Sequence, residues 1–65
     1  MIQAVAVTHE GHSVPCPAHR MEPLLQVVSG PHAGRRGCRR CLGPVEEDAA
    51  RTADLATGEI ARQLR

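Results

Sequence analysis

The chain has 65 residues, a net charge of +1 and no Phe, Tyr or Trp. A domain of this length buries only about 60% of the surface that its unfolded chain exposes. Small aliphatic side chains supply most of the apolar content, which excludes a large hydrophobic core. We therefore expect a single domain over residues 1–65 that depends on an additional staple, such as a metal ion.

Cysteine content and hydropathy indicate the compartment. The three cysteines are an odd number, which argues against a disulfide framework because one thiol would be left over. No apolar run approaches the roughly 18 residues of a membrane-spanning helix, and no charged and then apolar leader precedes a cleavage site. We expect a cytoplasmic protein without a membrane partner.

The N-terminal segment is predicted to form a short hairpin. Residues 1–14 alternate loosely between apolar and polar side chains and are rich in β-branched residues. Glu10–Gly11 can make the tight turn of this hairpin. Pro15 and Pro17 then flank Cys16 and forbid regular ladder pairing, so a turn is expected there.

A second hairpin is expected in the middle of the chain. Residues 24–29, "LLQVVS", give the strongest strand signal and are ended by Gly30–Pro31. The loop that follows leads to residues 35–37, which are expected to return as a short partner strand. This second hairpin would run directly into Cys38.

The C-terminal third is predicted to be helical. Gly43 is an acceptable N-cap, Pro44 suits the first helical position, and the acidic run that follows favours the positive end of the helix dipole. Apolar positions from Val45 to Leu64 keep near-helical spacing, although Gly58 interrupts it, so two shorter helices remain an alternative. The expected fold class is therefore α+β: a small zinc-stabilised domain with two short β-hairpins and their ligand turns over residues 1–43, followed by a C-terminal helix over residues 44–65.

Two ligand pairs carry the clearest chemical signal. Cys16 and His19 are separated by two residues, as are Cys38 and Cys41, and residues 20–37 lie between the pairs. Such spacing lets each pair project from one tight turn, and it matches four-ligand structural zinc sites. Redox-active or inert thiols are the alternatives. We predict a structural Zn²⁺ bound by Cys16, His19, Cys38 and Cys41, because most iron–sulfur clusters require four thiolates.

The fourth ligand has competitors. His12 lies four residues before Cys16, and His32 lies in the loop between the two ligand pairs. Spacing favours His19, and His9 and His12 are expected to be exposed on the first hairpin. With four protein ligands no position remains open for water, so the metal would hold the fold rather than catalyse.

The pattern "CPAH…CRRCLGP", within residues 15–44, resembles small zinc-ribbon and treble-clef domains. The proline-rich first ligand turn looks like that of a zinc ribbon, whereas a helix after the second pair looks more like a treble clef. The chain departs from the commonest pattern by having His in place of the second Cys and by lacking aromatic residues. The resemblance is to a class shared by unrelated functions.

Basic charge is concentrated around the cysteines. Residues 15–41 carry five arginines against one acidic residue, Glu22. A turn fixed by metal would display guanidinium groups that contact phosphate with little loss of entropy. Without aromatic side chains the chain cannot stack bases on rings, so contact with the nucleic-acid backbone is expected. The predicted phosphate-contacting residues are Arg35, Arg36, Arg39 and Arg40.

Two functions are compatible with this pattern. The first is a small regulatory or accessory factor that contacts nucleic acid. The second is a protein-interaction module that docks on a partner or on its own copy through the predicted C-terminal helix, with no nucleic-acid contact. The apolar residues assigned to that docking face are Val45, Leu55, Ile60 and Leu64.

No enzymatic activity is expected. The chain has no serine beside an evident base, no glycine-rich phosphate loop and no open metal position. No small-molecule substrate is evident either. The acidic run at residues 46–48 is better explained as a helix start than as an acid–base pair.

Overall fold

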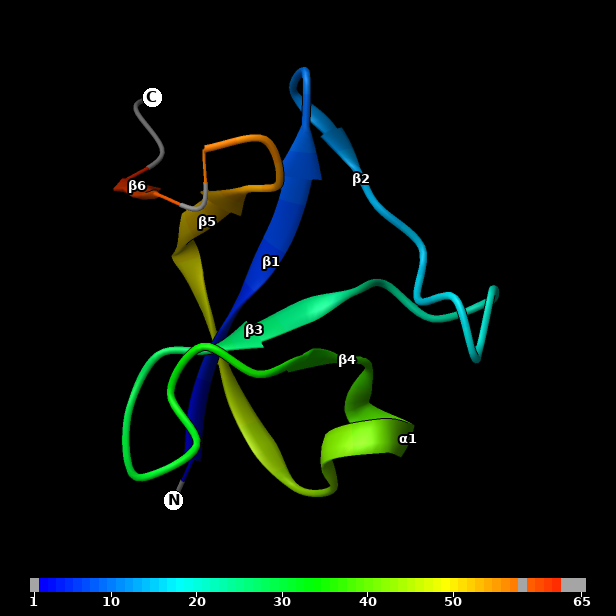
Figure 1. The fold of residues 1–65 in the computed structure, drawn as a ribbon, viewed down its shortest axis with the longest axis vertical. Helices are drawn as coiled ribbons and strands as arrows, with labels where there is room; N and C mark the ends of the chain where they lie inside the picture. Colours follow the sequence, from blue (N-terminus) through cyan, green and yellow to red (C-terminus); the bar gives the residue numbers. More distant parts are fainter. Residues whose placement is uncertain (1, 58, 63–65) are drawn as a thin grey trace.

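Strands dominate the structure, a computed structural model that describes residues 2–57 and 59–62 (Figure 1). The elements in chain order are β1 (Ile2–His9), β2 (His12–Ser13), β3 (Leu25–Val27), β4 (Arg36–Gly37), α1 (Arg39–Leu42), β5 (Val45–Asp54) and β6 (Ile60–Arg62). Within these residues, no helix has the length and apolar character that crossing a membrane requires.

The strands form one sheet around β1. The strand order is β4-β3-β1-β5-β6, and β2 pairs with β1 beyond its contact with β3. All pairings are antiparallel except that of β1 with β5, which is parallel. Figure 1 shows β1 in the middle, with β3 and β4 to one side and β5 and β6 to the other. The result is a small α+β fold with mostly antiparallel strands and a single short helix among the described residues.

Both predicted hairpins are confirmed. His9 lies opposite His12 across the β1–β2 turn, and Gln26 lies opposite Arg36 across the β3–β4 pair. The alternating and β-branched composition of β1 suits a strand that is paired on both edges. The buried side chains come mainly from β1 and β3, and Val5 and Leu25 are 0% exposed.

The prediction of a C-terminal helix over residues 44–65 is wrong. Residues Val45–Asp54 form β5 and Ile60–Arg62 form β6, and the other described residues of this range belong to no helix. Residues 58 and 63–65 lie outside the described residues. The local helical spacing is overridden by tertiary pairing, because β5 supplies a hydrogen-bonded partner for the second edge of β1. Helix propensity is a weak guide where such a partner is available.

The helix that the structure contains, α1, ends just before the range predicted to be helical. α1 contains the two residues between Cys38 and Cys41 and ends at Leu42. Its C-cap, Gly43, has φ 82° and donates its N–H to the carbonyl of Arg39. A glycine with positive φ just after a helix, followed by Pro44, is a helix stop. Gly43 and Pro44 therefore end a helix rather than begin one, contrary to the expectation from the sequence.

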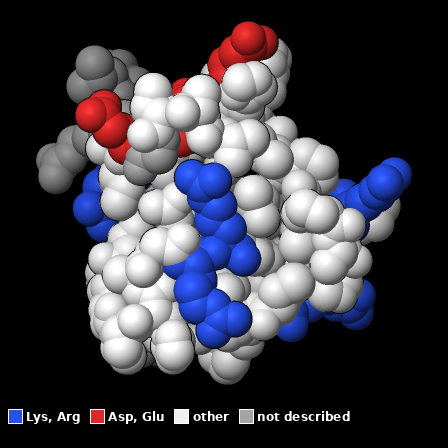
Figure 2. All heavy atoms as spheres, viewed as in Figure 1, with Lys and Arg blue, Asp and Glu red and all other residues white. Residues whose placement is uncertain are grey.

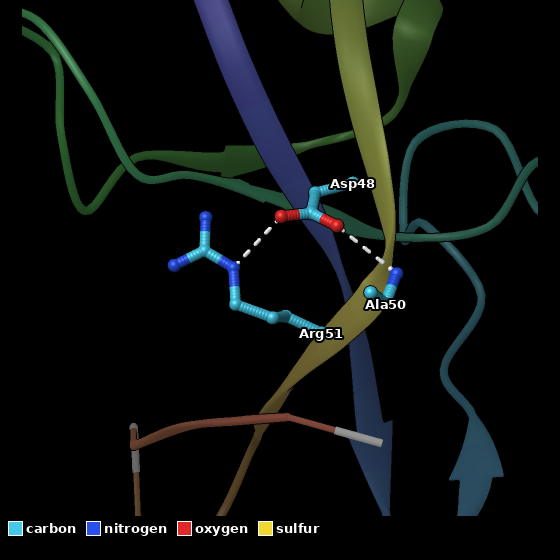
Figure 3. A network of polar contacts seen from close by, with 3 residues as sticks. All are labelled: Asp48, Ala50 and Arg51. Atoms are coloured by element: carbon cyan, nitrogen blue, oxygen red, sulfur yellow. Dashed lines mark hydrogen bonds and ion pairs between the residues drawn. The ribbon is translucent and has the colours of Figure 1, made fainter. Parts of the chain in front are cut away.

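A bulge divides β5 into two pieces. Ala4 pairs with Glu47 and Ala6 with Thr52, so four residues of β5 lie opposite Val5 alone. The Asp48 carboxylate closes this bulge: one oxygen accepts the Ala50 N–H at 3.0 Å and the other accepts Arg51 Nε–H at 2.8 Å (Figure 3). An aspartate that caps its own backbone two residues on stabilises a turn rather than a helix.

Replacing Asp48 by alanine is expected to lower the free energy of unfolding by about 1–2 kcal/mol, because it removes both hydrogen bonds of the bulge. Asp48→Asn keeps an acceptor for the Ala50 N–H, so it should lose less than Asp48→Ala. Urea denaturation of the three proteins measures the difference. Equal stability of wild type and Asp48→Ala would show that the bulge does not depend on this carboxylate.

Candidate metal centre

The first ligand turn lies between β2 and β3. Pro15 and Pro23 form an isolated antiparallel bridge at its base. Inside it the Cys16 N–H donates to the Glu22 carbonyl at 2.9 Å, and the His19 N–H donates to the Cys16 carbonyl at 3.2 Å. These bonds fold residues 16–22 into a compact loop that presents Cys16 and His19 together.

The second ligand turn joins β4 to α1. Cys38 is the N-cap of α1, and its carbonyl accepts the N–H groups of Cys41 at 3.1 Å and Leu42 at 2.9 Å. This single helical turn points both cysteine side chains the same way. The turn is close-packed, since a Cβ added at buried Gly37 would lie 2.9 Å from Cys41 Cβ.

The two turns bring the four predicted ligands together. Cys16 Sγ and Cys38 Sγ each lie 3.7 Å from Cys41 Sγ, and His19 Nδ1 lies 3.2 Å from Cys38 Sγ and 3.3 Å from Cys41 Sγ. All four donor atoms lie within 4.8 Å of one another. The cluster is therefore a group that can hold a metal ion.

The spacing of these atoms suits a tetrahedral ion. Zinc–sulfur bonds of about 2.3 Å and zinc–nitrogen bonds of about 2.0–2.1 Å put tetrahedral ligands about 3.8 Å apart for two sulfurs and about 3.6 Å for sulfur and nitrogen. The sulfur–sulfur distances of 3.7 Å match the expected sulfur–sulfur separation. The sulfur–nitrogen distances of 3.2 and 3.3 Å are a few tenths of an ångström shorter than the expected separation. The three cysteines are free thiols, and 3.7 Å is far beyond the roughly 2.05 Å of a disulfide.

The cluster also belongs to the core. Cys16 and Cys38 are buried and pack with Val7 and Leu24 in one apolar group, against which Val14 rests. His19 is half-buried and Cys41 is exposed, so the cluster lies at the edge of this group rather than inside it. A metal bound here would join the two ligand turns to Val7 of β1 and to Leu24, just before β3, through shared side-chain contacts.

The environment changes the pKa values of Cys16 and Cys41 in opposite directions. Burial raises its pKa, but hydrogen bonds from the backbone of His19 and Ala18 and contacts with the other two thiols lower the pKa of Cys16 to about 6. For Cys41, a hydrogen bond with the Cys38 backbone lowers the pKa, but contacts with Cys38 and Cys16 together with burial outweigh it and raise the pKa. The geometry thus favours one thiolate at Cys16 even without a cation, which is the form that binds metal.

The competing histidines are not part of the cluster. The group that can hold a metal contains His19, whereas His12 lies in β2 and His32 lies in the loop between β3 and β4, both exposed. The spacing of two residues, rather than mere proximity in sequence, is what places a histidine beside Cys16.

The predicted arginines lie around the second ligand turn, and all four are exposed. Arg39 Nη2 forms an ion pair with Glu47 Oε1 at 3.3 Å, and Arg36 Nε donates to Gln26 Oε1 at 2.9 Å. Arg35 and Arg40 have no such side-chain partner among the residues that the structure describes. Figure 2 shows arginine side chains as a band down the middle of one face, with acidic side chains gathered at one end of that face.

The proposed docking residues do not form a helix face. Val45 is half-buried in β5, Leu55 is 37% exposed just after β5, and Ile60 is 41% exposed in β6. Leu64 lies outside the described residues. An amphipathic helix for partner docking is therefore absent from residues 45–57 and 59–62.

Two residues that support the centre were not predicted. Gly37 allows the close contact with Cys41, and Gln26, a buried polar residue of β3, accepts the hydrogen bond from Arg36. A glycine immediately before a ligand pair was the available signal for the first. Nothing in the local sequence indicates that Gln26 would be buried opposite an arginine.

Comparison with known proteins gives no further guidance. No family model, no curated protein and no solved structure matches this chain.

Proposed function

We propose that the chain is a small zinc-binding protein in which Zn²⁺ has a structural role, held by Cys16, His19, Cys38 and Cys41. The observation that carries this proposal is the convergence of four soft or borderline donors from two separate turns within 4.8 Å. Three thiolates and one imidazole are a usual structural zinc set, and a complete set leaves no position for a reacting water. An enzymatic role is therefore not proposed.

Charge balance supports the same assignment. Three thiolates and a neutral imidazole leave a formal charge of −1 around Zn²⁺. Arg39 and Arg40 lie between the two ligands of the second turn and temper this charge. Three cysteines that form no disulfide are typical of a reducing compartment, which supports the proposal of a cytoplasmic location.

The identity of the fourth ligand is testable with two histidine variants. Loss of a residue that only hydrogen-bonds to a metal ligand weakens metal binding about 10–100-fold. His19→Ala removes a ligand itself, so we expect it to weaken zinc binding by more than this. His32→Ala removes an exposed histidine from the β3–β4 loop and should leave zinc affinity unchanged. Competition with a chromophoric chelator measures both. Equal zinc affinity of His19→Ala and wild type would show that His19 is not a ligand.

We further propose that the second ligand turn contacts nucleic-acid phosphates. The specific support is the exposure of Arg35 and Arg40 beside a turn that metal would make rigid. The absence of aromatic residues favours backbone contact over base stacking. Arg36 and Arg39 are already bonded within the protein, so we expect them to contribute less.

Binding of a duplex oligonucleotide, followed by fluorescence anisotropy at several salt concentrations, tests this role. Each lost phosphate contact should reduce the slope of log K against log salt by about 0.9. Arg40→Ala is expected to show this reduction, whereas Arg20→Ala, an equal charge change on the first ligand turn, should not. Identical slopes for the two variants would show that binding depends on net charge alone and would contradict a specific phosphate contact by Arg40.

The alternative function is a protein-interaction module. Its docking surface would not be a helix, because residues 45–54 and 60–62 form strands. The exposed apolar residues that remain to support it are Met21 at 95%, Ile60 and Leu55. A partner bound through these residues would give salt-insensitive binding, unlike phosphate contact. Binding that survives high salt and is lost on Ile60→Ser would favour this alternative.

A further inference from the structure

The β1–β2 turn places two histidines directly opposite each other. His9 ends β1 and His12 begins β2, and the antiparallel register makes them partners. Side chains of directly opposed residues project from the same face of a hairpin, with Cβ atoms about 4.5–5.5 Å apart. Both histidines are exposed, so their rings are accessible to solvent.

The connection between them is a tight two-residue turn. Glu10 has φ 53° and Gly11 has φ 79°, as in the type I′ turns that favour glycine and asparagine. A glutamate at positive φ is strained, and Glu10 is the one residue other than glycine with positive φ among those described. This turn fixes the register that opposes the two imidazoles, and it adds a carboxylate to the same tip.

We propose that His9 and His12 form a second, exchangeable site for a divalent transition metal ion that prefers imidazole, such as Ni²⁺, Cu²⁺ or Zn²⁺. Two imidazoles preorganised across a hairpin bind one ion as a chelate, whereas two independent histidines bind it singly and weakly. The site is separate from the four-ligand cluster: Figure 1 shows the β1–β2 turn at one end of the long axis and α1 toward the other.

The donor set defines how this site differs from the cluster. It has no thiolate and is open to solvent, so water completes the coordination and the ion exchanges easily. Ni²⁺ is the appropriate probe because it binds imidazole strongly and does not oxidise thiols as Cu²⁺ does. Loading the protein with one equivalent of zinc first occupies the cysteines.

Isothermal titration of the zinc-loaded protein with Ni²⁺ tests the proposal. Wild type should bind one Ni²⁺ per chain, and His9→Ala and His12→Ala should each lose about tenfold or more in affinity, because either change destroys the chelate. His32→Ala removes another exposed histidine, outside the β1–β2 hairpin, and is the matched control, expected to bind as wild type does.

The variants separate this site from the zinc proposal. All substitutions are at exposed positions, and circular dichroism checks that each variant remains folded. If the three histidine variants bind Ni²⁺ equally, or if the wild type binds none, the cross-strand site is refuted. A protein that takes up no zinc but still binds Ni²⁺ through His9 and His12 would refute only the four-ligand centre.

Discussion

Cys38→Ser is expected to unfold the protein at room temperature. The side chain of Cys38 is 0% exposed, lies 3.7 Å from Cys41 Sγ and is part of the apolar group with Val7 and Leu24. A core of this size rarely supplies more than about 3–5 kcal/mol, and the free energy of binding a structural metal is then the free energy that holds the fold. Serine is a poor zinc ligand and a polar residue, so the variant loses the free energy of metal binding and weakens the apolar group around Cys38.

The matched control is Ala4→Ser in β1. Ala4 is also 0% exposed, and the change buries a hydroxyl of the same kind away from the ligands, at a cost of about 1–3 kcal/mol. Far-ultraviolet circular dichroism and urea denaturation in the presence of zinc compare the two. If Cys38→Ser is destabilised no more than Ala4→Ser, the loss reflects a buried hydroxyl and the metal contributes nothing to stability.

Gly37→Ala is expected to distort the centre without replacing any of the four proposed ligands. The new Cβ would lie 2.9 Å from Cys41 Cβ and 3.3 Å from Leu42 Cγ, and a Cβ cannot move aside as the end of a long side chain can. Relief of this contact requires Cys41 to shift, at a cost of about 1–3 kcal/mol for overpacking. Weaker metal binding and altered absorption bands of the cobalt-substituted protein should result, because those bands report tetrahedral geometry.

Gly34→Ala is the control for this prediction. Gly34 lies in the loop between β3 and β4, has φ 96° and has open space around it, so alanine there strains the backbone without crowding the ligands. It should lower the free energy of unfolding yet leave the cobalt spectrum unchanged. Identical spectra for wild type and Gly37→Ala would show that the second ligand turn tolerates the extra carbon.

The cluster of Cys16, His19, Cys38 and Cys41 could be predicted because each pair is a local feature. Two residues between ligands fit one tight turn, so Cys16 and His19, and Cys38 and Cys41, are brought together by bonds within single loops. Only the meeting of the two turns is long-range, and the β3–β4 hairpin that joins them had a strong strand signal. Spacing also selected His19 over His12 and His32.

The C-terminal strands could not be predicted because their cause is not local. Ile2 pairs with Val45 in a parallel arrangement, a contact between residues far apart in the sequence. The local composition of β5 contains alanines and acidic residues that favour a helix, and the bulge at Asp48 interrupts the alternation that would have indicated a strand. For the same reason, the described residues of the predicted docking face do not lie on a helix.

Native mass spectrometry of the protein with and without a strong chelator, with circular dichroism on the same samples, tests whether a metal ion holds the fold. We expect one zinc ion per chain and loss of the β-sheet signal when the chelator removes it. A chain that carries no metal and keeps its circular dichroism spectrum in chelator would contradict the structural-zinc proposal.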